Sequence, residues 1–143
     1  MTDIVDGTQG DRLAAAALGL VGVPFRMHGR DPATGLDCVG VAVAALAGIG
    51  TQVSPPLDYR LRGGCLHRFD RWAAQCGLTA VPLRGKDVPG DVLLCAAGPQ
   101  QFHVMIDAGP VLVHAHATVR RVVAHPRPSP WPVVRRWQLS RES

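Results

Sequence analysis

The order of predicted elements places this chain in the α+β class. Two helical patterns come first, over residues 11–21 and 38–49, and a third covers residues 66–76. From Asp91 onward the pattern changes to short apolar runs broken by Gly and Pro, which is typical of strands. Helices followed by consecutive strands predict a domain in which a helix packs on a mainly antiparallel sheet.

The helices can be predicted from caps and spacing. Asp11 can cap the first helix, whose buried face is expected to hold Leu13, Ala17, Leu18 and Val21. The second helix, CVGVAVAALAGI, is apolar on every side, which is typical of a buried central helix, and Gly50 ends it. The third has its apolar residues at helical spacing and ends at Gly77; these residues are Leu66, Phe69, Trp72, Ala73 and Cys76.

About five strands are predicted after the helices, near residues 91–96, 102–107, 111–117, 119–124 and 132–139. The turn-rich segment HGRDPATG (28–35) is expected to be a loop, and residues 51–62, with Pro55-Pro56, an irregular connection. There is no internal repeat and no clear domain boundary. We therefore expect one domain over residues 1–143.

The composition excludes some function classes. A chain with 47% hydrophobic and 18% charged residues is expected to fold. No apolar run reaches the roughly 20 residues of a membrane span, so we expect no membrane insertion. The stretch LAAAALGLVGV (13–23) follows acidic residues and precedes no cleavage signal, so we interpret it as a helix and expect no signal peptide.

The chain is basic, with a net charge of +4 and a pI of about 9.3. Arginines gather toward the C-terminal end, at Arg120, Arg121, Arg127, Arg135, Arg136 and Arg141. They favour either solvated strand faces or an acidic partner. No nucleic-acid module is recognisable, so we expect no direct nucleic-acid readout.

One of the four cysteines has the setting of a nucleophile. Cysteines at 38, 65, 76 and 95 form no C-x-x-C pair, and we expect all four to be reduced thiols made in a cytosol. Cys76 and Cys95 have apolar neighbours and are interpreted as core residues. Cys38 opens the central helix, where the helix N-terminus stabilises a thiolate and free N–H groups can stabilise an oxyanion. We therefore expect a lowered pKa for Cys38.

Two histidines are predicted to lie beside each other on a hairpin. A four-residue loop from Asp107 to Pro110 pairs Ile106 with Val111 and, counting back, His103 with His114. If the central helix packs on that face, Cys38 is the nucleophile, His103 its base and His114 the group that orients the base. His116 shares the face one pair further along and is a weaker candidate.

A zinc site is the alternative interpretation, because His114-x-His116 beside His103 resembles a metal cluster. No His-Glu-x-x-His helix or acidic general base accompanies these histidines. Motifs for phosphate or dinucleotide binding are also absent. We therefore expect neither a metal nor a cofactor.

Three segments are informative together: GVPFRMHGRDPATGLDCVG (22–40), PGDVLL (89–94) and HVMIDAGPVLVHA (103–115). In this order and spacing they resemble the NlpC-type cell-wall peptidases, which are papain-like cysteine enzymes. The resemblance implies a papain-like α+β fold with Cys38, His103 and His114 as the catalytic residues. The chain departs from the family pattern at Phe25, Val39 and Met105, where the family has Tyr, Ser and a small residue. The larger Met105 side chain is expected to crowd the cleft beside Cys38.

The resemblance also implies a function. It suggests a peptidoglycan hydrolase, either a cysteine endopeptidase or an amidase, of the phage-tail and gene-transfer-agent branch. Such a protein is made in the bacterial cytoplasm and incorporated in a phage-like particle, with peptidoglycan as substrate and tail-tip or baseplate proteins as partners. Further candidates for substrate or oxyanion binding are Phe25, Asp37, Val39, Tyr59 and His116.

Two alternatives to a wall hydrolase stay open. The first is a structural tail-tip subunit with little activity, favoured by Phe25 and Met105. The second is a thiol amidase or acyltransferase that acts on a substrate outside the cell wall, because the same site serves acyl transfer in general.

Overall fold

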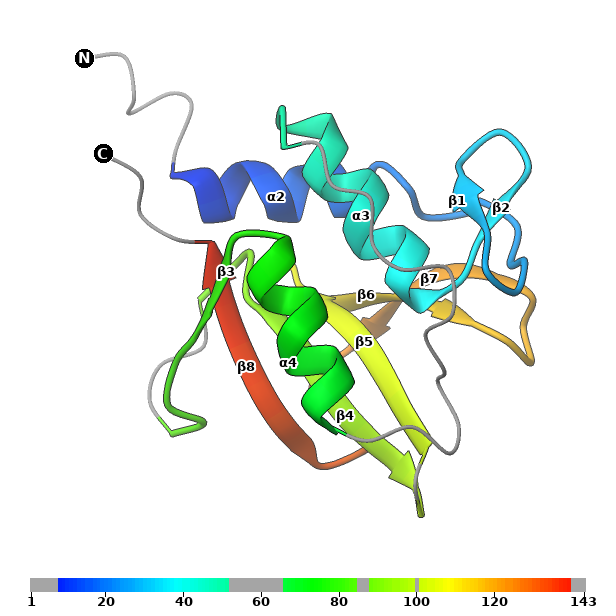
Figure 1. Ribbon diagram of the computed structural model, residues 1–143. Helices are drawn as coiled ribbons and strands as arrows, with labels where there is room; N and C mark the ends of the chain where they lie inside the picture. Colours follow the sequence, from blue (N-terminus) through cyan, green and yellow to red (C-terminus); the bar gives the residue numbers. More distant parts are fainter. Residues whose placement is uncertain (1–7, 52–65, 85–87, 100, 140–143) are drawn as a thin grey trace.

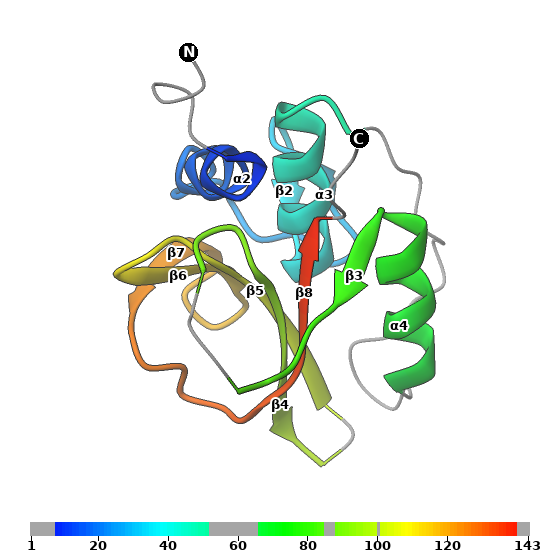
Figure 2. The same ribbon diagram turned by 90° about the vertical axis from the view of Figure 1, so that its left-hand side faces the viewer.

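Three helices pack on one face of an antiparallel sheet (Figures 1 and 2). The structure is a computed structural model and describes residues 8–51, 66–84, 88–99 and 101–139. The helices within these residues are α2 (Gln9–Leu18), α3 (Cys38–Gly48) and α4 (Leu66–Gln75). The predicted α+β class is confirmed. No helix among the described residues has both the length and the apolar character needed to span a membrane.

The main sheet has six strands in the order β3-β8-β4-β5-β6-β7. Five of them match the predicted strands: β4 (Val92–Gly98), β5 (Gln101–Asp107), β6 (Val111–His116), β7 (Arg121–Pro126) and β8 (Val133–Leu139). The short edge strand β3 (Leu78–Ala80) and the small pair β1 (Arg30–Asp31) and β2 (Gly35–Leu36) were not predicted. Strands of two or three residues are too short to show an alternating pattern.

Helix α2 begins one turn earlier than predicted. Thr8, not Asp11, is its N-cap: Asp11 N donates to Thr8 Oγ1 (3.0 Å) and Thr8 N donates to Asp11 Oδ2 (3.2 Å), which makes a capping box. Leu13 is buried as expected, but Leu18 and Val21 are each 43% exposed. Leu18 is the last residue of the helix, and Val21 lies in the turn that follows it.

Helix α3 forms the centre of the core, as its all-round apolar sequence predicted. Seven of its residues are buried, from Cys38 and Val39 at the start to Leu46 in the last turns. Its first turn packs closely on the segment before it, because a Cβ added to Gly40 would collide with the main-chain oxygen of Gly29. The start of α3 is therefore held against residue 29.

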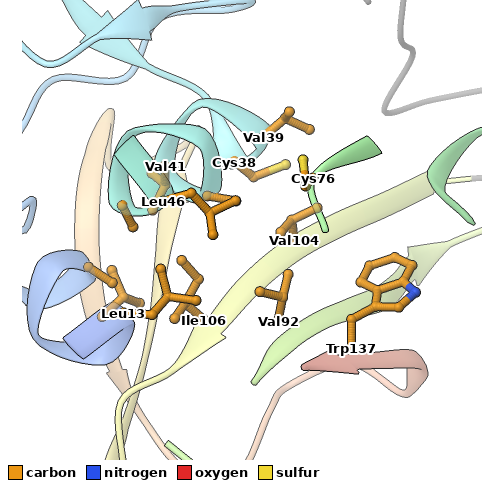
Figure 3. Packing of buried hydrophobic residues seen from close by; sticks show 14 of the residues in the cluster. Leu13, Cys38, Val39, Val41, Leu46, Cys76, Val92, Val104, Ile106 and Trp137 are labelled. Atoms are coloured by element: carbon orange, nitrogen blue, oxygen red, sulfur yellow. The ribbon is translucent and has the colours of Figure 1, made fainter. Parts of the chain in front are cut away.

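Side chains on the two faces of the sheet form two separate clusters. On the face toward the helices, the larger cluster includes Val92, Leu94, Val104, Ile106 and Val113 (Figure 3). On the opposite face, Leu93, Cys95, Met105 and Leu112 form a smaller cluster with Trp131 and Val133. The residues alternate between the clusters along each strand, as the two-residue period of a strand requires.

The register predicted for the β5–β6 hairpin is wrong. Ile106 pairs with Val113 and Asp107 with Leu112, two positions away from the predicted pairs. Ala108 N donates to Val111 O (2.9 Å), so the hairpin turns through Gly109 and Pro110. Gly109 takes the positive φ of 85° that this turn needs, and Pro110 has no donor role in it.

Two glycines of α3 provide a matched test of this packing. Gly40→Ala should lower the free energy of unfolding by about 1–3 kcal/mol, because the new methyl group overlaps the Gly29 main chain. Gly48→Ala should leave it unchanged or raise it by up to about 1 kcal/mol, since that methyl group meets only the Ala16 Cβ at 3.5 Å. Urea denaturation measures both. Equal stabilities for the two variants would show that α3 is not held against residue 29.

Candidate active site

The main chain around Cys38 is fixed by Asp37, the N-cap of α3. Asp37 Oδ1 accepts a hydrogen bond from Gly40 N (2.8 Å), and Asp37 Oδ2 accepts one from His28 N (2.9 Å). His28 has a positive φ of 59°, which is uncommon for a residue other than glycine. The carboxylate thus joins the loop at residue 28 to the first turn of the helix that carries the thiol.

The Cys38 thiol is buried between α3 and β5, at 1% exposure (Figure 3). Burial raises the pKa of this thiol well above its ordinary value, and the negative charge of Asp37 raises it further. Hydrogen bonds with the main chain of Val104, Val39 and Cys38 itself act in the opposite direction. The expected lowering of the Cys38 pKa is therefore wrong, because burial outweighs these hydrogen bonds and the helix N-terminus.

His103 and His114 form a hydrogen-bonded pair. His103 Nε2 lies 2.7 Å from His114 Nδ1, and the two rings are nearly perpendicular, with centroids 4.8 Å apart. The Trp131 ring packs edge-on against both histidines, at 5.0 Å from His103 and 6.0 Å from His114. The prediction that both histidines share one face is confirmed, although they are diagonal neighbours in the observed register and not a direct pair.

Cys38 does not share that face. Val104, which follows His103 on β5, belongs to the cluster beneath α3 together with Cys38. Cys95, which pairs directly with His103 across β4 and β5, belongs to the opposite cluster, as does Trp131. The prediction that α3 packs on the face that carries the histidines is therefore wrong. The thiol and the imidazole pair lie on opposite faces of the sheet.

Met105 lies on the same face as the histidines. Its Sδ is 3.7 Å from Cys95 Sγ, and it is fully buried. The sequence suggested that this side chain would crowd the cleft beside Cys38. It does not, because residues 103 and 105 point the same way along β5.

The remaining predicted site residues have mixed positions. Phe25 is half-buried against the helix-side core, and its N–H donates to Arg120 O (3.0 Å). Val39 is buried in the same core. The His116 ring lies 5.6 Å from that of His114. Tyr59 and Cys65 lie outside the described residues.

Two further residues of the histidine cluster were missed by the sequence interpretation. Trp131 covers the pair from the β7–β8 connection, and the His125 ring on β7 lies 5.9 Å from that of His114. Because His125 pairs with Leu112 of β6, its side chain lies on the same face of the sheet as those of Leu112 and His114. The position of Trp131, in the segment Ser129-Pro130-Trp131-Pro132, had no sequence signal.

Burial keeps both histidines neutral. Desolvation lowers the pKa of His103 to about 4, and the charge of His116 contributes. Desolvation also lowers the pKa of His114 to about 3, with contributions from His103, His116 and His125. His114 Nε2 is buried and forms no hydrogen bond with the described residues. At neutral pH a single proton can therefore be shared along the bond between the two rings.

Metal binding has no prepared site in the part of the chain that the structure describes. No group of three or more His, Cys, Asp or Glu side chains there is arranged to hold an ion. The cluster around His114 is thus packed ring against ring, with no common coordination point.

Solved structures with the same fold are NlpC/P60 domains. NlpC2 of Trichomonas vaginalis matches with a TM-score of 0.68 and 18% identity, over 93% of this chain and 46% of that one. The P60 domain of the antigen MAP1204 from M. avium subspecies paratuberculosis matches with a TM-score of 0.58 and 19% identity, over 91% and 93% of the two chains. The NlpC/p60 domain of the peptidoglycan hydrolase SagA matches with a TM-score of 0.56 and 21% identity, over 83% and 90%.

These similarities establish the papain-like NlpC/P60 fold. This chain spans less than half the length of the T. vaginalis proteins NlpC2 and NlpC1, at 46% and 45%. No family model matches the sequence, and no curated protein is similar enough to count as a match.

The buried histidines predict a loss of stability in mild acid. Their pKa values are about 4 and about 3 in the folded chain, against an ordinary value of 6.5, so the unfolded chain binds more protons between these limits. The free energy of unfolding should have its full value above about pH 6.5 and should fall as the pH is lowered toward 3–4. The midpoints of urea denaturation from pH 4 to 8 measure the slope of stability against pH.

A matched pair of variants tests the source of the acid sensitivity. His114→Gln removes one buried imidazole and should flatten the slope, whereas His67→Gln, on the exposed side of α4, should leave it as in the wild type. An unchanged slope in the His114 variant would contradict the assignment of the slope to this cluster.

Proposed function

We propose that this chain is a cysteine hydrolase that cuts amide bonds in bacterial peptidoglycan, with Cys38 as nucleophile. The main support is the place of Cys38 at the first residue of the buried central helix, within a fold shared with the domain of a peptidoglycan hydrolase. The hydrogen bonds that the main chain makes at the sulfur favour the thiolate over the thiol.

The proposed chemistry is acyl transfer in two steps. The base takes the proton of the Cys38 thiol, and the thiolate attacks the carbonyl carbon of the amide. The base then gives that proton to the leaving amine, and a thioester remains on Cys38. Water then hydrolyses the thioester and releases the acid product. The N–H groups of Cys38 and Val39 at the start of α3 interact with the sulfur in the resting protein, so they become available to the oxyanion only after the sulfur has attacked.

The proposal assigns the base role to His103 and the orienting role to His114. Their bond of 2.7 Å supports the orienting role, because such a contact fixes the tautomer of a base. Since His103 and Cys38 lie on opposite faces, this assignment requires β5 to turn about its axis near residue 103. That rotation would break no β5–β6 pair at His103, because those pairs involve only Ile106 and Asp107, but it would break the β4–β5 pair of His103 with Cys95.

A finer part of the proposal is a place at the tail tip of a phage-like particle, where the protein opens the cell wall for DNA delivery. The compact single-domain pattern of the sequence supports it. Co-sedimentation of the protein with purified particles, together with other tail-tip or baseplate proteins, tests it.

A structural subunit with little activity is the second candidate function. The raised pKa of the buried Cys38 thiol and its separation from the histidines favour this candidate. Phe25 adds to it, because a phenyl ring offers no hydrogen bond to a developing charge. A thiol amidase or acyltransferase would use the same nucleophile, Cys38, and would differ from the peptidoglycan hydrolase only in the substrate that it binds.

Substitution of single cysteines tests the hydrolase. Cys38→Ala should lower the release of soluble muropeptides from purified peptidoglycan by about 1000-fold or more, because it removes the attacking atom. Cys76→Ala removes the same atom from another buried site in the helix-side core and should keep most of the activity. Circular dichroism should show both variants folded.

Two outcomes would decide against the hydrolase. If wild-type protein released no muropeptides while Cys38 stayed chemically intact, the structural subunit would be the better assignment. If the wild type and the Cys38→Ala variant released them equally fast, the nucleophile would have to be another group.

A further inference from the structure

The connection between β7 and β8, residues 127–132, covers the histidine pair on the face of the sheet away from α3 (Figure 2). We call this connection the strap. It contains no helix or strand. One end is fastened by Arg127, whose Nη1 lies 3.0 Å from Asp107 Oδ2, and the other by Pro132, whose O accepts a hydrogen bond from Ala96 N (2.9 Å). The strap is therefore held to the sheet at both ends.

Within the strap, Ser129 fixes the position of Trp131. Ser129 Oγ donates to Trp131 O (2.7 Å) and accepts a hydrogen bond from Trp131 N (3.1 Å), which closes a short turn. The Trp131 ring then lies edge-on over His103 and His114, with centroids 5.0 Å and 6.0 Å away. His114 is 1% exposed beneath it, whereas Trp131 is half-buried. Trp131 thus forms the outer cover of the histidine pair.

The part of β5 that carries His103 is paired on one side only in the described sheet. The β5–β6 pairs involve Ile106 and Asp107, so His103 pairs with Cys95 of β4 and with no residue of β6. The register of β4 with β5 shifts just beyond this pair, and its register with β8 shifts at Cys95. Irregular pairing of this kind changes the direction of side chains. Sheet pairing therefore fixes the direction of His103 less firmly than that of Ile106, which is paired on both sides.

A local turn of β5 at this point would carry the His103 imidazole toward the thiol. The main chain of the next residue, Val104, forms a hydrogen bond with the Cys38 sulfur. His103 is thus one residue away from the sulfur along the strand, although its side chain points to the other face. The contact between the His103 and Trp131 rings belongs to the resting arrangement alone. A contact made in only one of two states favours that state.

We propose that the strap is autoinhibitory: Trp131 holds His103 on the face away from Cys38, and release of the strap frees His103 to act as the base. This inference rests on the proposed function and adds a regulatory element to it. An edge-on aromatic contact shifts an equilibrium of this kind by about twofold to tenfold. Loss of the Trp131 ring should therefore raise the population of the turned state by that factor.

The test follows alkylation of Cys38 by iodoacetamide at pH 7 in the full-length protein, measured by mass spectrometry. Trp131→Leu keeps an apolar side chain but removes the ring over His103, and should speed the reaction by up to about tenfold. The gain should vanish when His103→Ala is added to Trp131→Leu, because it depends on an imidazole that reaches the thiol. Trp131→Phe keeps an aromatic ring and should react nearly as slowly as the wild type.

A matched pair of arginine variants tests the fastening of the strap. Arg127→Gln removes the ion pair with Asp107 and should also speed the reaction of Cys38, by a smaller factor. Arg135→Gln removes an ion pair with Asp70 on α4 and should leave the rate as in the wild type. The two arginine side chains are similarly exposed, at 28% and 35%. Circular dichroism and urea denaturation show whether each variant is folded, so that unfolding is not mistaken for release of the strap.

The outcomes separate the autoinhibition from the hydrolase. Faster alkylation that depends on His103 supports the autoinhibition even if no variant cuts peptidoglycan, a result that would remove only the hydrolase. An unchanged rate in Trp131→Leu, an increase that persists without His103, or an equal increase in the two arginine variants would overturn the autoinhibition. If the wild type cuts peptidoglycan with Cys38 and Trp131→Leu cuts it no faster, the hydrolase stands and the autoinhibition does not.

Discussion

The alternation of side chains along β5 is the constraint on which the rest of this structure depends. Helix α3 is apolar all round and must be covered on the sheet side, and Val104 and Ile106 of β5 provide that cover. A strand that points these two residues at α3 must point His103 and Met105 the other way. A slip of one residue would reverse this, but it would place the His103 imidazole in the core beneath α3 and move Val104 and Ile106 to the face of the smaller cluster.

This constraint explains the separate chemistry of the two clusters. Beneath α3 the thiol of Cys38 is surrounded by apolar groups and stays protonated, since Asp37, which starts the helix, adds a negative charge beside it. On the opposite face the histidines stay neutral and share a hydrogen bond under Trp131. Nucleophile and base are therefore both present in this resting arrangement, but neither activates the other.

Sequence reasoning predicted the elements far better than it predicted how they face each other. Helix α3 and the five longer strands were found because periodicity and terminal glycines are local signals. The hairpin register was wrong because it depended on the turn at Gly109-Pro110, where a shift of two positions leaves every face unchanged. Which face α3 covers is a tertiary choice. The buried Val104 and Ile106 decided it, and a pattern in which both faces are apolar could not show it.

The central claim is that Cys38, in the resting protein, has no imidazole partner among the described residues and has a raised pKa. The rate of Cys38 alkylation by iodoacetamide, followed by mass spectrometry as a function of pH, tests it most directly. We expect a slow rate at pH 7 that keeps rising for as long as the fold persists, with the same profile in the His103→Ala variant. A fast rate that levels off below pH 8 and is lost in the His103→Ala variant would reveal a thiolate–imidazolium pair and contradict the account.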